Sequence, residues 1–168
     1  MSIRPATADD AAAIATVHVQ AWRESYPGLV PDAVLAALDP CRRTEMWRAA
    51  IPRGGVFVAA EDADLVGFVA WGPQSDATLS FAAEVSALYV LRRAQWRGHG
   101  RALMRAAAAE MQKAGFGSAG LWVLDGNAPA RRFYETLGGR ACATRQDERE
   151  GWTAHETAYG WDTLDSLT

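Results

Sequence analysis

QWRGHGRALM, residues 95–104, places Gly98 and Gly100 immediately before a segment with the apolar spacing of a helix. A short apolar run, Leu88 to Val90, precedes the stretch and indicates a strand. Glycine is unfavourable in a helix because it loses more backbone entropy on folding than any other residue. It does let the backbone come close to an anion, and the unpaired N–H groups and positive dipole at a helix start bind phosphate oxygens. The pattern therefore indicates a phosphate site, although plain loop geometry also produces it.

Two common phosphate motifs do not fit this stretch. The dinucleotide fingerprint needs a third glycine, but Leu103 stands at that position. Asp125 is a poor match for the acidic residue that the fingerprint requires about 20 positions further on. A P-loop needs Gly-Lys followed by Ser or Thr, and the sequence contains no such tripeptide. Both motifs are excluded.

The stretch instead resembles the pyrophosphate loop of the GCN5-related N-acetyltransferases, the GNAT superfamily. That loop follows the pattern Gln/Arg-x-x-Gly-x-Gly/Ala, which Gln95–Gly100 matches in full. A second block, Trp122–Asn127 followed by Ala130, Phe133, Tyr134 and Leu137-Gly138, resembles the family's next strand, turn and helix. The order of predicted elements also suits the family, so the resemblance covers essentially the whole chain. One departure is Arg92, at a turn position where many members carry proline.

The resemblance implies acetyl-CoA (coenzyme A) as cofactor. Family members bind the pantetheine arm where the sheet splays, which here assigns the arm to the backbone of Leu88 and Val90. The N–H groups of residues 97–101 are then expected to bind the pyrophosphate. The side chains of Arg92, Arg93, Arg97 and Arg101 either serve the 3′-phosphate or form a solvated face. The cofactor-binding residues that the resemblance assigns are Leu88, Tyr89, Val90, Gln95, Trp96, Arg97, Gly98, His99, Gly100, Arg101, Asn127, Ala130, Phe133 and Tyr134.

Two catalytic residues follow from the same resemblance. Tyr134 matches the family's frequent general acid, and a phenol with a pKa of about 10 is protonated at neutral pH and can donate to a departing thiolate. Its alternative role is core packing. Glu84, on the strand that leads to Leu88, is the expected base for an amine that arrives as ammonium, or else a solvated residue at a strand start. Ser86 shares the face of Glu84 by period 2 and is expected to orient water. Asn127 is assigned to the pantetheine and is also a candidate helix cap.

The acceptor residues are expected on two segments. The loop after the first helix contributes Trp22, Tyr26 and Leu29, for which core packing is the alternative. The last strands contribute the surroundings of Trp152 and His155. Glu84 and Ser86 complete the expected acceptor set.

The predicted function is transfer of the acetyl group of acetyl-CoA to a primary amine of a small molecule or peptide. The alternatives are a protein or aminoacyl-tRNA acetyltransferase and a non-catalytic acyl-CoA-binding sensor or interaction domain, since a fold does not determine a function. The presence of both Tyr134 and Glu84 favours the enzyme, because a pure binding protein needs neither. Family members are often dimers, so a homodimer is a possible assembly.

The predicted fold is a mixed α/β (α+β) domain whose central, mostly antiparallel sheet is splayed and flanked by helices. The predicted strands are Ile3–Arg4, Val56–Ala60, Leu65–Trp71, Phe81–Val90, Gly120–Leu124, Ala141–Arg145 and Glu156–Trp161. The predicted helices are Asp10–Glu24, Asp32–Leu38, Arg42–Ala50, residues 101–114 and Ala128–Leu137. No linker divides the chain, so residues 1–168 are expected to form a single domain.

The composition excludes several protein classes. The 168 residues are 49% hydrophobic and 22% charged, which is typical of a globular protein, and the net charge of −3 argues against a dedicated nucleic-acid or acidic-membrane binder. The start MSIRPATADD lacks the apolar run of a signal peptide, and no stretch is long enough for a membrane span, so a cytoplasmic location is expected. Cys41 and Cys142 favour free thiols over a disulfide, and the scattered histidines give a metal site little support.

Overall fold

The computed structural model describes residues 1–149 and 151–167. Their strands form one sheet in the order β1-β2-β3-β4-β5-β7-β6. The strands are β1 (Ser2–Pro5), β2 (Val56–Glu61), β3 (Asp64–Pro73), β4 (Ala83–Val90), β5 (Ala119–Leu124), β6 (Arg140–Arg149) and β7 (Trp152–Trp161). Among these neighbours, β4 and β5 run parallel and every other pair is antiparallel. The predicted mixed, mostly antiparallel architecture is confirmed.

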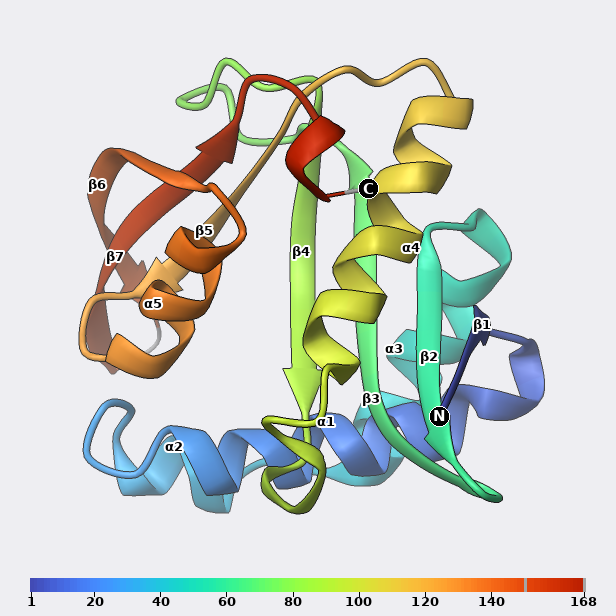
Figure 1. Cartoon of the computed structure of the whole chain (residues 1–168). Coiled ribbons are helices and arrows are strands. Elements are labelled where there is room, and N and C mark those ends of the chain that lie inside the picture. The colour runs from blue at the N-terminus through green and yellow to red at the C-terminus, as the bar shows by residue number, and fades with distance from the viewer. Residues whose placement is uncertain (150, 168) are drawn as a thin grey trace.

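Helices cover both faces of this sheet. They are α1 (Ala11–Ser25), α2 (Asp32–Ala36), α3 (Pro40–Ala50), α4 (His99–Lys113) and α5 (Ala128–Thr136). The first and third helices bury Ile14 and Trp47 against Val58 and Phe68 on one face. The fourth helix buries its apolar stripe against the opposite face, and α5 adds Tyr134 to the same cluster. Figure 1 shows α4 crossing the front of the sheet and α1 running along its lower end.

The sheet opens between β4 and β5. These two parallel strands pair only at Ala83 with Ala119 and at Glu84 with Gly120, and beyond those residues they diverge. The group β5, β7 and β6 therefore stands apart from β4 over most of its length (Figure 1). At the closed end the ring of Phe81 lies so close to the backbone that a Cβ at Gly120 would approach it to 2.4 Å. Glycine is needed there so that the ring can cover the point where the strands still meet.

A β-bulge interrupts β4 at Ser86. Ala87 lies opposite Ala70, whereas Val85 lies opposite Trp71, so Ser86 is an extra residue in the ladder. The bulge changes which side chains share a face. Val85 packs in the same cluster as Leu88, on the α4 side, while Ala87 packs on the α1 side. The alternation of faces is therefore shifted by one residue beyond Ser86.

The predicted elements occur in the predicted order, with most bounds shifted by one or two residues. Helix α4 begins at His99, two residues before the prediction, because Gly100 lies inside its first turn. Strands β6 and β7 form a hairpin that is longer than predicted and reaches Arg149 and Trp152. The added part of β6, residues 146–149, is polar throughout and alternates exposed with half-buried side chains at the sheet edge, so it lacks the apolar signal of a strand.

Cys41 and Cys142 are both exposed and unpaired. Within residues 1–149 and 151–167 no helix is long and apolar enough to cross a membrane.

Candidate active site

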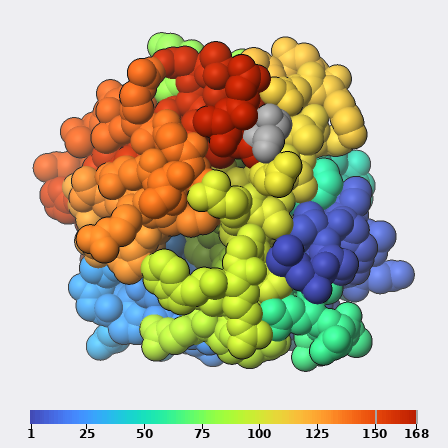
Figure 2. All heavy atoms as spheres, in the orientation of Figure 1, coloured from blue at the N-terminus to red at the C-terminus, as the bar shows by residue number. Residues whose placement is uncertain are grey.

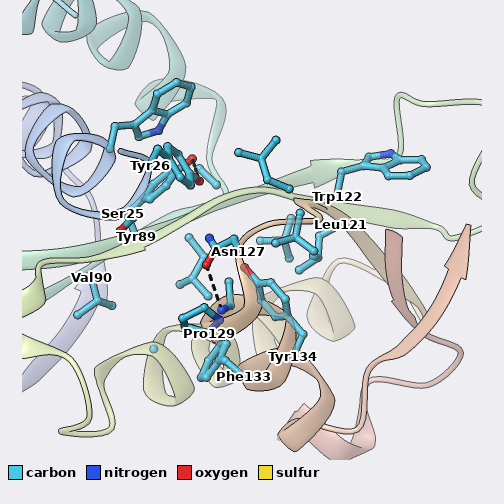
Figure 3. A pocket seen from close by; sticks show the side chains of 18 of the residues that line it. Ser25, Tyr26, Tyr89, Val90, Leu121, Trp122, Asn127, Pro129, Phe133 and Tyr134 are labelled. Atoms are coloured by element: carbon cyan, nitrogen blue, oxygen red, sulfur yellow. Dashed lines mark hydrogen bonds between the residues drawn. The ribbon is translucent and has the colours of Figure 1, made fainter. Parts of the chain in front are cut away.

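A cavity of about 1130 Å³ passes through the sheet where β4 and β5 diverge. Figure 2 shows a hollow on the α4 side, between the orange atoms around α5 and the yellow-green atoms of the β4–α4 loop. In Figure 3 the side chains of Tyr26 and Trp122 lie on one side of the strands, and those of Phe133 and Tyr134 lie on the other. All four line the same cavity. The opening therefore connects two mouths on opposite faces of the sheet.

The mouth on the α4 side contains the start of that helix. Gly98, the residue before it, adopts a φ of 88°, which other residues adopt rarely. No side chain caps the helix, so the N–H groups of its first turn are free to bind an anion. Arg101 in this turn lines the cavity and makes no hydrogen bond or ion pair with any residue in the described part of the chain. The start of α4 therefore offers an anion free N–H donors, the positive end of the helix dipole and an unpaired guanidinium.

Gly100 has a second reason to be glycine. A Cβ at this position would lie 3.1 Å from Cζ of Phe133 on α5, a separation tighter than ordinary contact. The two helices therefore approach each other through this residue. Phe133 and Ala130 of α5 line the cavity beside Gly100. The second glycine of the motif is thus the point where α4 and α5, the two helices that form this mouth, approach each other.

The β4–α4 loop is held by an acidic residue from another strand. Glu61 at the end of β2 accepts a 2.7 Å hydrogen bond from Nε2 of His99 and pairs with Arg97 at 3.3 Å. The hydrogen bond from His99 and the charge of Arg97 hold the pKa of Glu61 below its usual range. His99 is buried, so its imidazole contacts Glu61 while its backbone belongs to the first turn of α4.

Most of the residues assigned to the cofactor line this cavity. They are Leu88, Tyr89, Val90, Gln95, Trp96, Gly98, His99, Gly100, Arg101, Asn127, Ala130, Phe133 and Tyr134. Arg97 does not line it, because its guanidinium turns to Glu61. Arg93 turns in the same way to Asp64, at 3.9 Å. The side chain of Tyr89 lies on the α1 side of the sheet, stacked on His18 at 5.1 Å between ring centroids.

Tyr134 lies where the two mouths meet. Its ring is 8% exposed and packs against Phe133 and Trp161. Burial raises the pKa of its hydroxyl, so the phenol keeps its proton at neutral pH. The hydroxyl makes no hydrogen bond to the described residues and points toward the gap between the strands (Figure 3). Tyr134 therefore packs in the core and also lines the cavity.

Asn127 caps α5. Its Oδ1 accepts a hydrogen bond of 3.3 Å from the backbone N of Ala130, and Pro129 follows in the first turn. This cap fixes the start of the helix that carries Tyr134. Asn127 also lines the cavity, so the capping role and an approach to a ligand are compatible.

Glu84 lies at the closed end of the opening, on the last residue pair that joins β4 to β5. Its carboxylate accepts a hydrogen bond of 2.8 Å from the hydroxyl of Ser75. Both residues line the cavity. Ser86, the bulge residue, also lines it, but its hydroxyl donates to the carbonyl of Ala70 at 3.3 Å.

The second mouth, on the α1 side of the sheet, has a wall of charged side chains, most of them from β6 and β7. The sequence did not predict this wall. Arg145 pairs with Asp76 at 2.7 Å and with Glu156 at 2.8 Å, and its guanidinium stacks on Trp122 at 4.2 Å from the ring centroid. Arg149 pairs with Glu156 at 2.9 Å. The four charged residues of this wall and Trp122 all line the cavity. The one available signal was the alternation of charged residues near Arg145 and Arg149, which is also typical of an exposed strand.

The opposite wall of this mouth is aromatic. Trp22 and Tyr26 at the end of α1 pack edge to face, with ring centroids 5.0 Å apart. The hydroxyl of Tyr26 lies 3.4 Å from that of Tyr89. These residues and Leu29 line the cavity, as the sequence predicted for the loop after the first helix.

Trp152 and His155 were expected near the acceptor. Trp152 packs in one cluster with Trp22, Tyr26 and Leu29 and lies beneath the guanidinium of Arg149. Neither Trp152 nor His155 lines the cavity. His155 is exposed, because it lies on the face of β7 opposite to that of its buried neighbours Ala154 and Glu156. Within this hairpin, Glu156 and two arginines of β6, Arg145 and Arg149, line the cavity.

Comparisons with known proteins agree with this geometry. The model of the Acetyltransferase (GNAT) family matches residues 17–138. YuaI of Bacillus subtilis, an uncharacterized N-acetyltransferase, is 32% identical over 168 residues, which cover 99% of this chain and 96% of the relative. The structure of yncA from Salmonella typhimurium, solved with its cofactor acetyl-CoA, aligns with a TM-score of 0.73 at 22% identity over 98% of this chain and 94% of that one. PaiA N-acetyltransferase of Thermoplasma acidophilum, solved with coenzyme A, gives a TM-score of 0.71 at 18% identity, covering 95% and 98%.

Proposed function

This chain belongs to the GNAT family of acetyltransferases, and from that premise we propose that it transfers the acetyl group of acetyl-CoA to a primary amine of a small molecule or peptide. The transfer is direct: the amine and the cofactor occupy the cavity at the same time. The observation that carries this proposal is the single cavity that joins two mouths through the sheet, with Tyr134 between them.

The residues of the α4 mouth fit acetyl-CoA. The free N–H groups of the first turn of α4 suit a pyrophosphate, and the guanidinium of Arg101 adds a counter-charge. Along the opening, the edge of β4 from Val85 to Val90 has no pairing with β5, which leaves backbone groups for the amides of a pantetheine arm. When bound, acetyl-CoA supplies an activated thioester carbonyl.

Two side chains then handle protons. The carboxylate of Glu84 takes a proton from the ammonium, directly or through water, so that the neutral amine can attack. The N–C bond forms and the C–S bond breaks, and the hydroxyl of Tyr134 gives its proton to the departing sulfur. The proton that the attacking nitrogen loses as it becomes an amide then restores the phenol. The net products are an N-acetyl amide, coenzyme A thiol and one proton released to water.

Direct transfer is favoured over a covalent enzyme intermediate. The strongest nucleophiles in a chain are its thiols, and Cys41 and Cys142 are not among the residues that line the cavity. The cavity volume of about 1130 Å³ also exceeds that of most single-ligand sites, which leaves room for two substrates.

Release of free thiol from acetyl-CoA tests the proposal. The enzyme is incubated with acetyl-CoA and, one at a time, 2-phenylethylamine, spermidine, L-phenylalanine, L-phenylalaninamide and L-phenylalanylglycinamide, and mass spectrometry identifies the product. We expect thiol release above the no-amine rate with at least one amine, matched by an equal amount of N-acetylated product. Tight binding of coenzyme A without release for any amine would favour the alternative of a non-catalytic acyl-CoA-binding domain.

A further inference from the structure

The Glu84 end of the cavity carries an uncompensated negative charge. Glu84 accepts a hydrogen bond from Ser75 and forms no ion pair with any residue within 1–149 and 151–167. Its carboxylate lies on the wall of the cavity beside the closed end of the sheet opening. An ammonium group is the ligand chemistry that this carboxylate attracts.

The two arginines of β6 that line the cavity wall are already paired. Arg145 contacts Asp76 at 2.7 Å and Glu156 at 2.8 Å, while Arg149 contacts Glu156 and Asp147, each at 2.9 Å. Glu156, which both arginines contact, is 5% exposed. A ligand carboxylate would find no unpaired guanidinium here and would face Glu84. The wall therefore selects against a free amino acid, whose carboxylate stands one carbon from its amine.

A neutral hydrogen-bonding group does find partners at this end. Gln74 lines the cavity next to Ser75, and both its Nε2 and its Oε1 are buried without a hydrogen-bond partner in the described residues. Its backbone N donates to the carbonyl of Ala82 at 3.1 Å, which fixes the residue in place. A carboxamide with a free donor and a free acceptor matches another amide, because an amide offers the complementary acceptor and donor.

We propose that the acceptor is a primary amine with an amide on the adjacent carbon, as in an amino acid amide or at the N-terminus of a peptide. The ammonium faces Glu84, the amide pairs with Gln74, and Trp122 provides an apolar surface beside them. This inference rests on the proposed acetyl transfer and names its substrate class. By the same reasoning a free amino acid is a poor acceptor, because its carboxylate faces Glu84. A plain alkylamine is a poor acceptor because it leaves the carboxamide of Gln74 without a partner.

The test compares acceptors that share one side chain. These are L-phenylalaninamide, L-phenylalanylglycinamide, L-phenylalanine and 2-phenylethylamine, with kcat/KM for each referred to the concentration of neutral amine so that differences in amine pKa cancel. We expect kcat/KM for at least one amide to exceed that for the amino acid and for the alkylamine by at least tenfold. The dipeptide amide distinguishes an acceptor that is a peptide N-terminus from one that is a small amino acid amide. If the acceptor is a peptide N-terminus, L-phenylalanylglycinamide must react; if it is a small amide, L-phenylalaninamide alone is enough.

Gln74→Leu should reduce the preference for the better amide over 2-phenylethylamine to within threefold, because the paired donor and acceptor are lost. Gln146→Leu is the matched control: Gln146 is exposed on β6 outside the cavity, and the preference should stay at the wild-type value. Equal or better use of the amino acid or of the alkylamine would overturn this inference while the thiol release still supports acetyl transfer. Absence of thiol release with all four acceptors and with spermidine would overturn both.

Binding gives a readout without turnover. In isothermal titration with coenzyme A present, the better amide should bind at least tenfold more tightly than L-phenylalanine. Equal affinity for the two would contradict the inference.

Discussion

Glu61 on β2 accepts a 2.7 Å hydrogen bond from the buried His99 that begins α4. The Glu61 carboxylate also pairs with Arg97, two residues earlier in the same loop. The loop that offers its N–H groups at the cavity mouth is thus held by a strand on the far side of α4. Because an ionised carboxylate only accepts hydrogen bonds, Nε2 of His99 carries the proton. Glu61 therefore acts as a positioning residue for this loop.

Glu61→Gln should weaken the binding of coenzyme A about threefold to tenfold, because the loop loses the charge that holds Arg97 and His99. The value of kcat should change less than twofold, since Glu61 is not among the residues that line the cavity. Isothermal titration with coenzyme A and steady-state rates measure the two effects. Asp64→Asn is the control, since Asp64 pairs with Arg93 at 3.9 Å on an exposed surface. Equal affinity in Glu61→Gln and wild type would show that the loop does not need this contact.

Tyr134→Phe should lower kcat about tenfold to a hundredfold without abolishing turnover, because a thiolate whose conjugate acid has a pKa near 8.5 leaves with modest help. The affinity for coenzyme A should stay within twofold. Burial raises the pKa of Tyr134, so the phenol keeps its proton throughout pH 6–9 and the effect should not vary over this range. Tyr159→Phe is a matched control, since its hydroxyl donates to Glu135 at 2.7 Å and the residue does not line the cavity. Unchanged kcat in Tyr134→Phe, with chemistry rate-limiting, would exclude the acid role.

Glu84→Gln should lower kcat/KM about a hundredfold at pH 7, because the base that deprotonates the ammonium is lost. The deficit should shrink as the pH rises toward the pKa of the amine, since solvent then supplies the neutral form. Ser75→Ala removes the hydroxyl at 2.8 Å from this carboxylate and should cause a smaller loss. A deficit of constant size from pH 6 to 10 would argue for a role in binding alone.

His18 should make the fold sensitive to mild acid. Burial, together with the charge of Arg43, lowers its pKa to about 4, and its Nδ1 accepts a 3.2 Å hydrogen bond from Nε1 of Trp47. The unfolded chain binds a proton near pH 6.5, so the neutral histidine contributes fully above that pH and its contribution is lost as the pH falls toward 4. The loss amounts to about 3 kcal/mol.

Urea unfolding at pH 7, 5 and 4 measures this effect. His18→Gln, which keeps an acceptor for Trp47 but does not titrate, should lose about 3 kcal/mol less stability than wild type across the range. Carboxylates that titrate in both proteins cancel from the comparison. His155→Gln, at an exposed position, should follow wild type. Identical slopes for His18→Gln and wild type would contradict the buried neutral histidine.

The order of elements and the glycine-containing turn before α4 were predictable because they depend on local signals. Apolar spacing marked α4 and β5, and the glycines marked the start of the helix. The cap at Asn127 followed from the same local chemistry. Patterns of this kind involve residues that are close together in the sequence, so they can be recognised without a structure.

The rest depends on contacts between distant segments. The bulge at Ser86 arises from pairing with β3, and the link from Glu61 to His99 spans 38 residues. The acceptor wall joins Asp76 to Arg145 across 69 residues, and nothing in either segment alone indicates the other. The close approach of Gly100 to Phe133 on α5 likewise depends on a distant segment and has no signal in the residues around Gly100.

The central claim is that one cavity holds both substrates while the acetyl group passes directly between them. Initial rates measured with acetyl-CoA varied at several fixed concentrations of the best acceptor from the amine panel test this most directly. Double-reciprocal lines that intersect are the predicted result, since a ternary complex must form before thiol is released. Parallel lines would contradict the account, because they would mean that coenzyme A leaves before the amine binds and that a residue of the protein carries the acetyl group.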